Sequence, residues 1–573
     1  MFTLLDVLLP LAMIAVCIKP LGRYMARIYD PQKPCWLERR LSSFEHFIYR
    51  ACAIDAKEEM SWRSYAMCLL ILGLFGTLLM FAIFSLQGAL PLNPQGLPGL
   101  APDLAFNAAI SFVTNTNWQS YSGETTLSYF SQAMGCVVQN FLSAATGMAV
   151  AVALFRSFCR KQAETIGNAW VDIVRTILYI LLPLSIGFAV ILMSQGVIQN
   201  FNAYTAYTPL EALSAKTAAE PALMAMGPVA SQEAIKMLGS NGGGFFNTNS
   251  AHPFENPTPL SNLLQIVAIL LIPASLAYTF GSMVRDRRQG WMLIVTMSII
   301  FLPLLVVGLV SEQRANPRFS TQVVDISAGN VEGKETRFGV ASSVLWAAAT
   351  SGTSNGSVNA MHDSFQPMAG FVPLLLILFG EVVFGGVGSG MYGTLMFVLL
   401  TVFVGGLMVG RTPEYMGKKL GPYEIKMASL FMLVPAVLVL CGAAFAVLSL
   451  EGASAIANGG AQGFSEILYA FASAANNNGS AFAGLSANSP FYNTILGIAM
   501  FIGRYWLIVL VLAVAGSVAR KNTIPVSAGT LPNHTPLFVF MLVGVIILLG
   551  ILTYVPALAL GPIAEHMQMY GGR

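Results

Sequence analysis

The stretch SNGGGFFNTNS, from Ser240 to Ser250, places three consecutive glycines between asparagines. A glycine loop of this kind can cradle a phosphate, act as a hinge, or offer backbone carbonyls to a cation. The phosphate interpretation requires the spacing GxxxxGK[ST], which the stretch lacks. A single loop is most often an ordinary turn, so the rest of the chain has to decide between these alternatives.

The composition is that of a polytopic membrane protein. The 573 residues are 55% hydrophobic and only 10% charged, with a mean hydropathy of +0.67. Apolar runs of about twenty residues, the length that spans a bilayer, recur from end to end. The net charge of +3, with no basic tract interleaved with aromatics, argues against nucleic-acid binding. The cysteines and histidines lack the spacing of metal ligands, so no metal site is predicted apart from the ion site below.

The lysines and arginines gather in five segments: 19–63, 156–175, 285–288, 411–426 and 520–521. By the positive-inside rule these segments face the cytoplasm, and the intervening segments lie outside. The chain is therefore predicted to cross the bilayer ten times, with both termini outside. The predicted spans lie near residues 3–20, 65–86, 130–155, 171–193, 261–284, 291–311, 371–410, 427–449, 495–519 and 537–558.

One pattern occurs four times between the second and the ninth span: an outgoing helix, a long polar Gly-rich outer segment, a returning helix and a short basic loop. Repeats of one orientation imply pseudo-fourfold packing about an axis along the membrane normal. The predicted fold is an all-α polytopic membrane protein with ten transmembrane helices and four helix/pore-loop/helix repeats around a pore. Its predicted parts are an extra N-terminal helix at 1–22, repeats at 64–160, 170–288, 289–415 and 425–521, and an extra C-terminal helix at 535–560.

Each outer segment contains about ten mostly apolar residues followed by a polar turn. These stretches are predicted to begin at an N-cap or breaker: Asp103, Ser231, Ser342 and Ser465. Ten helical residues reach only about 15 Å, half of the hydrocarbon thickness, which indicates a re-entrant half-helix followed by a non-helical strand. Such backbone is tolerated at membrane depth only where it faces protein or water. Four such strands around one axis would line a pore.

The four turns align as Thr116-Asn117, Asn241-Gly242, Asn355-Gly356 and Asn478-Gly479. Consecutive carbonyls can point at one axial cation only if some residues take positive φ, which glycine does without steric cost. Asn117 stands in the one aligned position without glycine, and asparagine tolerates the left-handed region best among the other residues. The negative ends of the half-helices favour a cation. Because few carboxylates are present, we expect a weakly hydrated monovalent ion.

The stretches FVTNTNWQSYSGE, GSNGGGFFNTNSAHPFENPTP, TSGTSNGSVNAMHDSF and ANNNGSAFAGL resemble those of the potassium-binding A subunit of the Kdp potassium-transporting ATPase. The resemblance covers essentially the whole chain and implies K+ as the substrate ion, with a filter open to the periplasm and a place in the bacterial inner membrane with both termini periplasmic. It also implies a complex with a P-type ATPase B subunit, a single-span C subunit and a small F subunit. The implied filter consists of Thr114, Asn115, Thr116, Asn117, Ser240, Asn241, Gly242, Gly243, Ser354, Asn355, Gly356, Ser357, Asn477, Asn478, Gly479 and Ser480.

The chain contains neither a DKTG phosphorylation motif nor a Walker loop. We therefore expect ATP to be hydrolysed by another subunit, and this chain to be a permeation subunit that binds no nucleotide and is not by itself an enzyme. A stand-alone potassium channel or an ion-coupled potassium symporter of the same architecture stays open as an alternative, because each of them needs a filter.

A predicted gate lies in the apolar segment 371–410, which is nearly twice as long as one crossing. The run GEVVFGGVGSGMYG interrupts it and predicts a helix broken by a glycine loop, with the ionisable Glu381 in the break. In the family that the chain resembles, the corresponding break obstructs the route below the filter. The predicted gate spans 380–390 and includes Gly385, Gly386 and Gly388.

Arg504 lies near the middle of the apolar run LGIAMFIGRYWLIVL. An arginine at that depth is costly unless it faces a cavity or a partner. One interpretation is a structural pair with Glu381 or with a neighbouring subunit. The other is a fixed positive charge below the filter, which prevents potassium from leaking to the cytoplasm and helps to divert it to the ATPase subunit. Gln119 is expected to tune affinity from beside the first filter strand, and Phe245 and Phe246 to pack behind the second.

Overall fold

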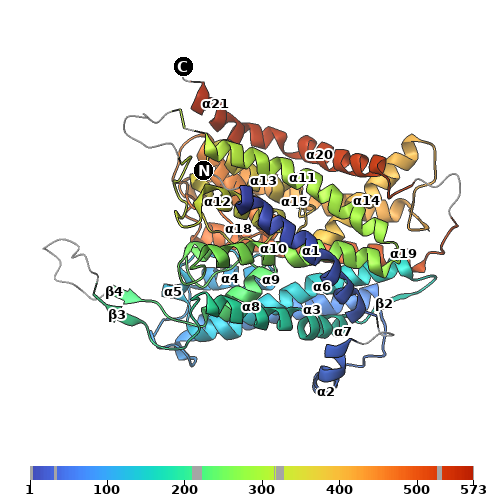
Figure 1. Cartoon of the computed structure of the whole chain (residues 1–573), viewed down its shortest axis with the longest axis horizontal. Helices are drawn as coiled ribbons and strands as arrows, with labels where there is room; N and C mark the ends of the chain where they lie inside the picture. The colour runs from blue at the N-terminus through green and yellow to red at the C-terminus, as the bar shows by residue number, and fades with distance from the viewer. Residues whose placement is uncertain are drawn as a thin grey trace.

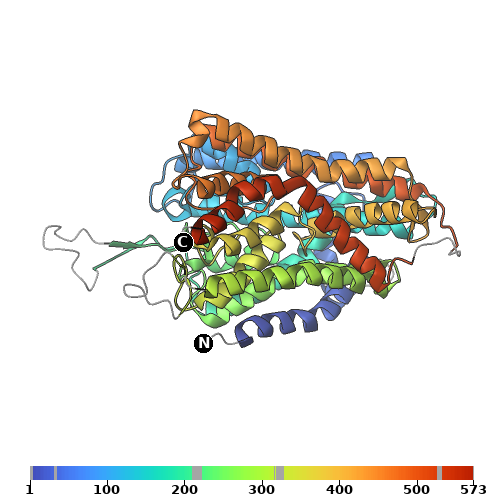
Figure 2. The ribbon, with the colours of Figure 1, turned by 90° about the horizontal axis from the view of Figure 1, so that it is seen from above.

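The computed structural model describes residues 4–30, 35–208, 222–314, 316–317, 328–525 and 532–571. Within these ranges ten helical segments are long and apolar enough to cross a membrane, which confirms the predicted number of spans. Figures 1 and 2 show them as a bundle of long helices running in a common direction. The spans comprise α1 (Leu4–Ile28), α3 (Trp62–Leu86), α6 (Val138–Cys159), α7 and α8 (Ala169–Arg175, Leu182–Ser194), α10 (Pro259–Met283), α11 (Arg287–Gln313), α14 (Ser389–Met408), α15 (Pro422–Leu448), α18 and α19 (Pro490–Phe501, Leu507–Arg520), and α20 with α21 (Pro536–Leu558, Ala564–Tyr570).

The first helix is longer than predicted, because α1 continues through Pro20 to Ile28. Neighbouring helices stabilise a membrane helix across a proline, and here α10 packs against this half of α1. A Cβ on Gly22 would lie 2.8 Å from the carbonyl oxygen of Ser275, and the hydroxyl of Thr279 donates to the carbonyl of Gly22 at 3.2 Å. Small residues permit this close approach of two membrane helices.

The segment between the first two spans forms an amphipathic helix that the sequence analysis did not predict, α2 (Trp36–Ala51). Its polar inner face holds Glu45, which accepts hydrogen bonds from the hydroxyls of Tyr49 and Tyr179, both at 2.6 Å, and from Arg175 at 2.9 Å. The remaining extramembrane structure includes three short antiparallel pairs: β1 (Met60–Ser61) with β2 (Thr165–Gly167), β3 (Thr205–Tyr207) with β4 (Ala222–Met224), and β5 (Glu414–Tyr415) with β6 (Lys418–Lys419). Both chain termini lie at the end of the bundle from which β3 and β4 project (Figure 1).

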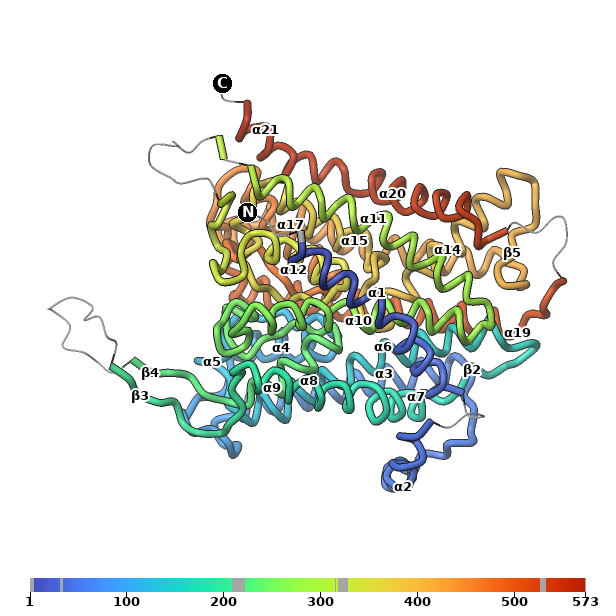
Figure 3. The backbone as a smooth tube through the Cα atoms, in the orientation of Figure 1, coloured from blue at the N-terminus to red at the C-terminus, as the bar shows by residue number. Residues whose placement is uncertain are grey.

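Four short buried helices lie inside the bundle, at one level and nearer the end that carries β3 and β4 (Figure 3). They contain 12, 10, 14 and 15 residues, so they reach about 15–22 Å, which is less than one crossing. Each is followed by a non-helical strand, as predicted for re-entrant half-helices. They are α4 (Pro102–Val113), α9 (Val229–Leu238), α12 (Gly339–Gly352) and α17 (Ala461–Ala475).

The predicted starts of these half-helices are wrong by a few residues. Asp103 is already inside α4, whose first residue is Pro102, and Ser231, Ser342 and Ser465 likewise lie within their helices. A proline or glycine marks the actual start in every case: Pro102, Pro228, Gly339 and Gly460. These residues turn the chain into the helix, because proline has its φ preset for a first turn and the two glycines have positive φ. The predicted repeat boundaries stay a prediction.

One ion pair and its hydrogen-bond partner join the ends of three spans. Arg156 of α6 contacts both carboxylate oxygens of Asp172 in α7, at 2.8 and 3.1 Å, and the hydroxyl of Tyr65 in α3 donates to the same carboxylate at 2.9 Å. Asp172 and Tyr65 are buried. Because both charges are paired bidentately, the contact fixes the relative register of the three helices.

Replacing this carboxylate should destabilise the bundle. We expect Asp172→Asn to lower the free energy of unfolding by about 3–5 kcal/mol, because it leaves a largely buried guanidinium without its charge partner. Thermal or denaturant unfolding of the purified chain in detergent measures the loss. The matched control is Glu59→Gln, which removes the half-exposed partner of Arg160 at the end of the same helix and should cost about 0–1 kcal/mol. Equal losses in the two variants would contradict the assigned role.

Candidate functional site

The four half-helices end in the same local structure. In each, a backbone N–H of the following strand donates to the carbonyl five residues earlier, in the last turn of the half-helix. The four pairs are Thr116 to Ser111 at 3.0 Å, Asn241 to Lys236 at 3.0 Å, Asn355 to Thr350 at 2.9 Å and Asn478 to Ser473 at 2.8 Å. The alignment made from the sequence therefore joins positions that are equivalent in the structure.

The backbone of each strand alternates between left-handed and right-handed conformations. Positive φ occurs at the four aligned positions, Asn117, Gly242, Gly356 and Gly479, with values of 56°, 82°, 89° and 96°. This confirms the predicted conformation, including that of asparagine in place of glycine. It also occurs two residues earlier, which was not predicted, at Asn115, Ser240, Ser354 and Asn477. Alternation of this kind turns successive carbonyls toward one side of the strand, as a cation filter requires.

Three of the four residues in the second set make tertiary side-chain hydrogen bonds, whereas the hydroxyl of Ser240 has no partner among the described residues. Asn115 donates from its amide to the carbonyl of Ser240 at 2.6 Å, Ser354 donates from its hydroxyl to the carbonyl of Asn476 at 2.9 Å, and the amide of Asn477 donates to the hydroxyl of Thr116 at 2.9 Å. These bonds connect neighbouring repeats and stabilise short polar side chains in the left-handed region. They could not be recognised from any single strand.

Backbone packs on backbone where neighbouring strands meet. A Cβ added to Gly242 would overlap the carbonyl oxygen of Asn355, one added to Gly356 would overlap that of Asn478, and one added to Gly479 would overlap that of Thr116. These contacts join repeat two to three, three to four and four to one. Glycine is needed at the aligned position for this close approach as well as for its φ.

The junction between repeats one and two is different, because Asn117 carries a side chain there. Gly243 makes room for it: a Cβ on Gly243 would lie 2.9 Å from the Cβ and from the amide nitrogen of Asn117. A Cβ on Gly244 would lie 2.9 Å from a carboxylate oxygen of Glu255. The three consecutive glycines thus have separate neighbours, namely the third strand, the first strand and a buried carboxylate.

Four carbonyls at the strand junctions have no hydrogen-bond donor. They belong to Thr116, Asn241, Asn355 and Asn478, which are all fully buried, and no hydrogen bond in the described ranges reaches their oxygens. Buried backbone carbonyls are almost always paired. Four equivalent unpaired carbonyls, one from each repeat, therefore form a set of acceptors suited to a desolvated cation.

The remaining filter candidates support the strands through their side chains or their own backbone. Thr114 donates to the carbonyl of Ile110 at 2.8 Å, the N–H of Ser357 donates to the Asn355 side chain at 3.0 Å, and the N–H of Ser480 donates to the Asn478 side chain at 3.0 Å. Gln119 exchanges two hydrogen bonds with the backbone of Gly244, at 3.0 and 3.2 Å. It braces the second strand from the first without being one of the unpaired acceptors.

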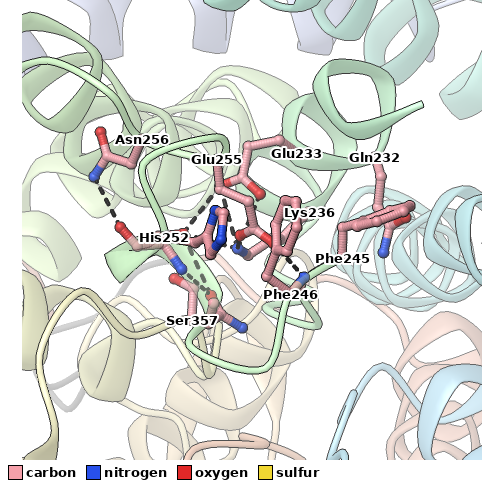
Figure 4. Close-up of polar contacts among 12 residues, drawn as sticks. Gln232, Glu233, Lys236, Phe245, Phe246, His252, Glu255, Asn256 and Ser357 are labelled. Atoms are coloured by element: carbon pink, nitrogen blue, oxygen red, sulfur yellow. Dashed lines mark hydrogen bonds and ion pairs between the residues drawn. The ribbon is translucent and has the colours of Figure 1, made fainter. Parts of the chain in front are cut away.

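Repeat two contains a buried charge cluster that the sequence analysis missed. The ammonium of Lys236 lies 2.9 Å from Glu233, 2.7 Å from Glu255 and 2.8 Å from the hydroxyl of Ser250 (Figure 4). All three charged side chains are at most 1% exposed. Lys236 occupies the position held by serine or threonine in the other three repeats. An alignment of the half-helices could therefore have identified this lysine as exceptional.

Within the cluster, the positive charge of Lys236 is compensated mainly by the carboxylate of Glu255. Burial raises the pKa of Glu233 and acts in the same direction on Glu255, but there the ammonium of Lys236 and the N–H of Phe246 outweigh burial and lower the pKa. The N–H of Phe246 donates to Glu255 at 2.8 Å, and the ring of His252 stacks on that of Phe246 at 3.7 Å (Figure 4). Phe245 and Phe246 are both buried, as predicted.

The predicted break in the seventh span is present. Helix α13 (Pro367–Leu378) ends before α14, and the residues between them include Glu381, Gly385 and Gly388 with positive φ. The N–H of Gly385 donates to the carbonyl of Gly352 at 2.9 Å, which places the loop against the C-terminal end of α12. The N–H of Gly386 donates to the Glu381 carboxylate at 3.3 Å. The loop is therefore folded on itself directly beside a filter strand.

Arg504 is buried in the π-helical turn between α18 and α19, and it donates to the carbonyl of Ser143 in α6 at 3.2 Å. It forms no direct ion pair with Glu381, since the described residues place no carboxylate oxygen within 4.0 Å of its guanidinium. Both side chains instead line one cavity, together with Asn476 and Asn477 of the fourth strand. The interpretation of Arg504 as the direct ion-pair partner of Glu381 is therefore wrong.

Comparisons with known proteins give one answer. The sequence profile of a family described as "Potassium-transporting ATPase A subunit" matches residues 8–567. Proteins named potassium-transporting ATPase potassium-binding subunit are 56% identical in Methylococcus capsulatus, covering 99% of this chain and 98% of the relative, and 58% identical in Sorangium cellulosum, covering 96% of each.

A solved structure shares the fold. The crystal structure of the potassium transporter TrkH from Vibrio parahaemolyticus covers 88% of this chain and 97% of its own, with a TM-score of 0.52 and 14% sequence identity. At that identity the likeness concerns the fold alone. The match of the family profile along almost the whole length, with the relatives at 56% and 58% identity, shows that the chain belongs to the family of potassium-transporting ATPase A subunits.

Proposed function

We propose that this chain binds potassium at its outer side, in a filter of backbone carbonyls, and passes the ion on to an ATPase subunit. The observation that carries the proposal is the set of four buried carbonyls without donors, one from each repeat, at Thr116, Asn241, Asn355 and Asn478. Neutral oxygens suit an ion that loses its water easily, which favours potassium over a strongly hydrated cation. The family relatives are named as potassium-binding subunits.

The proposed site includes the whole of the four strands, 114–117, 240–243, 354–357 and 477–480. The unpaired carbonyls contact the ion, and the other backbone and side-chain groups of the strands hold them in place. K+ is the substrate ion, and the absence of a phosphorylation motif and a Walker loop from the sequence supports a chain without nucleotide. The proposed setting is the bacterial inner membrane with both termini in the periplasm, which the distribution of basic residues supports.

The proposed partners are a P-type ATPase B subunit, a single-span C subunit and a small F subunit, within the lipid bilayer. A stand-alone channel and an ion-coupled symporter are the alternatives. The names of the relatives favour the ATPase assembly. The deciding observation is whether a protein that carries DKTG co-purifies with this chain and hydrolyses ATP on addition of potassium.

The loop between α13 and α14 and the side chain of Arg504 are proposed to control how the ion leaves. The loop packs against the end of the third half-helix, and a Cβ on Gly388 would overlap the backbone of Gly147 in α6. It therefore closes the space between two repeats. Arg504 places a fixed positive charge in the cavity that reaches the fourth strand, where it opposes direct passage of potassium to the cytoplasm.

A methyl group in the strand junction should abolish tight potassium binding. We expect Gly356→Ala to weaken potassium affinity by at least about tenfold, equivalent to about 1.4 kcal/mol, because its Cβ would overlap the carbonyl oxygen of Asn478. Gly242→Asp should act in the same way and reduce discrimination against rubidium and sodium. The measurement is potassium-stimulated ATP hydrolysis by the co-purified complex. The matched control is Gly187→Ala in α8, where an added Cβ meets no atom within 4 Å. An unchanged ion profile in Gly356→Ala and Gly242→Asp would refute the filter assignment.

Removal of the buried positive charge should uncouple transport from hydrolysis. We expect Arg504→Gln to lower the number of potassium ions accumulated per ATP, because a neutral glutamine no longer repels a cation in this cavity. Parallel assays of uptake into vesicles and of phosphate release give the ratio. Arg520→Gln, at the exposed end of the same helix, is the control. Wild-type coupling in Arg504→Gln would exclude the proposed role.

A further inference from the structure

The carbonyl at the aligned glycine position differs between repeats. In repeat two the side-chain amide of Asn249 donates to the carbonyl of Gly242 at 2.7 Å. The equivalent carbonyls of Asn117, Gly356 and Gly479 accept no hydrogen bond from any part of the chain that the structure describes. Repeat two is therefore the one quadrant in which this carbonyl is held from outside its own strand.

The orientation of Asn249 is fixed by its other contacts. Its side-chain oxygen accepts from the N–H of Ser250 at 2.8 Å and lies 3.4 Å from the N–H of Val358 in repeat three. An amide oxygen that accepts from backbone N–H groups leaves the NH₂ group to face Gly242. Asn249 is buried and has a φ of 55°, which asparagine tolerates better than most residues.

A chain of buried groups connects Asn249 to the charge cluster. The hydroxyl of Ser250 donates to Glu233 at 3.0 Å and lies 2.8 Å from the ammonium of Lys236. The same hydroxyl lies 3.3 Å from the side-chain oxygen of Asn249. Lys236 also anchors the filter strand directly, since its backbone carbonyl accepts from Asn241. Lys236 thus anchors the start of the strand through its backbone, and its side chain contacts Ser250, whose N–H donates to the side chain that holds the carbonyl of Gly242.

In the other repeats a shorter side chain, with a hydroxyl group, stands at the position of Lys236. The hydroxyl of Ser111 donates to the carbonyl of Trp118 at 2.9 Å, and the hydroxyl of Ser473 accepts from the N–H of Gly479 at 2.8 Å. These contacts brace each strand from its own half-helix. In repeat two the hydroxyl is replaced by an ammonium that reaches the outer segment instead, at the cost of burying three ionisable side chains.

We propose that Lys236, Ser250 and Asn249 form a positioning relay for the carbonyl of Gly242, and that this relay makes repeat two the quadrant that sets the size of the ion site. The inference rests on the proposed function. A carbonyl oxygen has two lone pairs, so it can accept from Asn249 and still face an ion. A site that distinguishes ions of similar radius needs at least one coordinating group whose position is rigid. The carbonyl of Gly242 meets this requirement, because the relay that holds it ends in a buried ion pair.

Two substitutions of Asn249 test the relay. Asn249→Asp keeps the acceptor for Ser250 and the tolerance of positive φ, but it loses the donor to Gly242. Asn249→Gly removes the side chain without straining the backbone. The matched control is Asn262→Asp in the first turn of α10, because the side-chain oxygen of Asn262 accepts from Asn256 and from Asn359 of repeat three, and no hydrogen bond links it directly to the four strands.

The assay is ion-dependent protection of the purified full chain against thermal unfolding, titrated separately with KCl, RbCl and NaCl. Both Asn249 variants should weaken potassium binding by about threefold to tenfold, as expected for one hydrogen bond, and should weaken rubidium binding less. The ratio of potassium to rubidium affinity therefore falls, whereas it stays at the wild-type value in Asn262→Asp. A merely structural contact would weaken all ions in proportion.

A second variant tests the charged end of the relay. Lys236→Met with Glu255→Gln removes the ammonium without leaving the Glu255 carboxylate unpaired, and it should lower the same ratio. The relay would be overturned if the ratio of potassium to rubidium affinity stayed at the wild-type value both in Asn249→Gly and in this double variant. For this outcome to count against the relay alone, Gly356→Ala must still abolish potassium binding. Absence of any potassium effect on the wild-type chain would instead overturn the proposed function, and the relay with it.

Discussion

The contact of backbone with backbone at the strand junctions is the constraint on which the structure depends. Four carbonyl oxygens can meet around one axis only if the chains approach more closely than side chains allow, so each strand needs glycine or an asparagine beside a compensating glycine. The half-helices, the polar side chains behind the strands and the ten spans hold this arrangement. Hydrogen bonds do not do so alone, because the junction carbonyls of Thr116, Asn241, Asn355 and Asn478 have no donors.

The surrounding bundle shields the non-helical backbone of the four strands from lipid, where its polar groups could find no hydrogen-bond partners. In each strand several backbone N–H groups donate to the last turn of the half-helix, and side chains of Asn115, Ser354 and Asn477 bond to a neighbouring repeat. Carbonyls without donors remain at the strand junctions and, in repeats one, three and four, at the aligned position as well. In contact with lipid such groups would carry a large penalty, which is why the half-helices are buried almost completely while the outer spans are not.

Much of this was accessible from the sequence, because lipid imposes strong and local requirements. Span length, basic loops and the recurrence of Gly-Asn turns predicted the ten helices, the four pore loops and the conformation of the aligned residues. The errors arose where tertiary contacts decide. The starts of the half-helices depend on proline and glycine upstream of the stronger capping residues. The positive φ of Ser354 depends on a carbonyl of another repeat, and the burial of Lys236 depends on a carboxylate nineteen positions later.

The departures from fourfold symmetry concentrate in repeat two and at its junctions. Asn117 faces Gly243 at one junction, Lys236 replaces a hydroxyl in the half-helix, and Asn249 holds the carbonyl of Gly242. In a ring of four identical repeats all four strands would shift by the same amount, because each strand would pack against a neighbour of equal flexibility. A ring with one quadrant tied to a buried ion pair has a fixed reference against which the other three can adjust. The asymmetry of the glycine-rich stretch is therefore a property of the ion site as a whole, and it follows from placing charge behind only one of four otherwise similar strands.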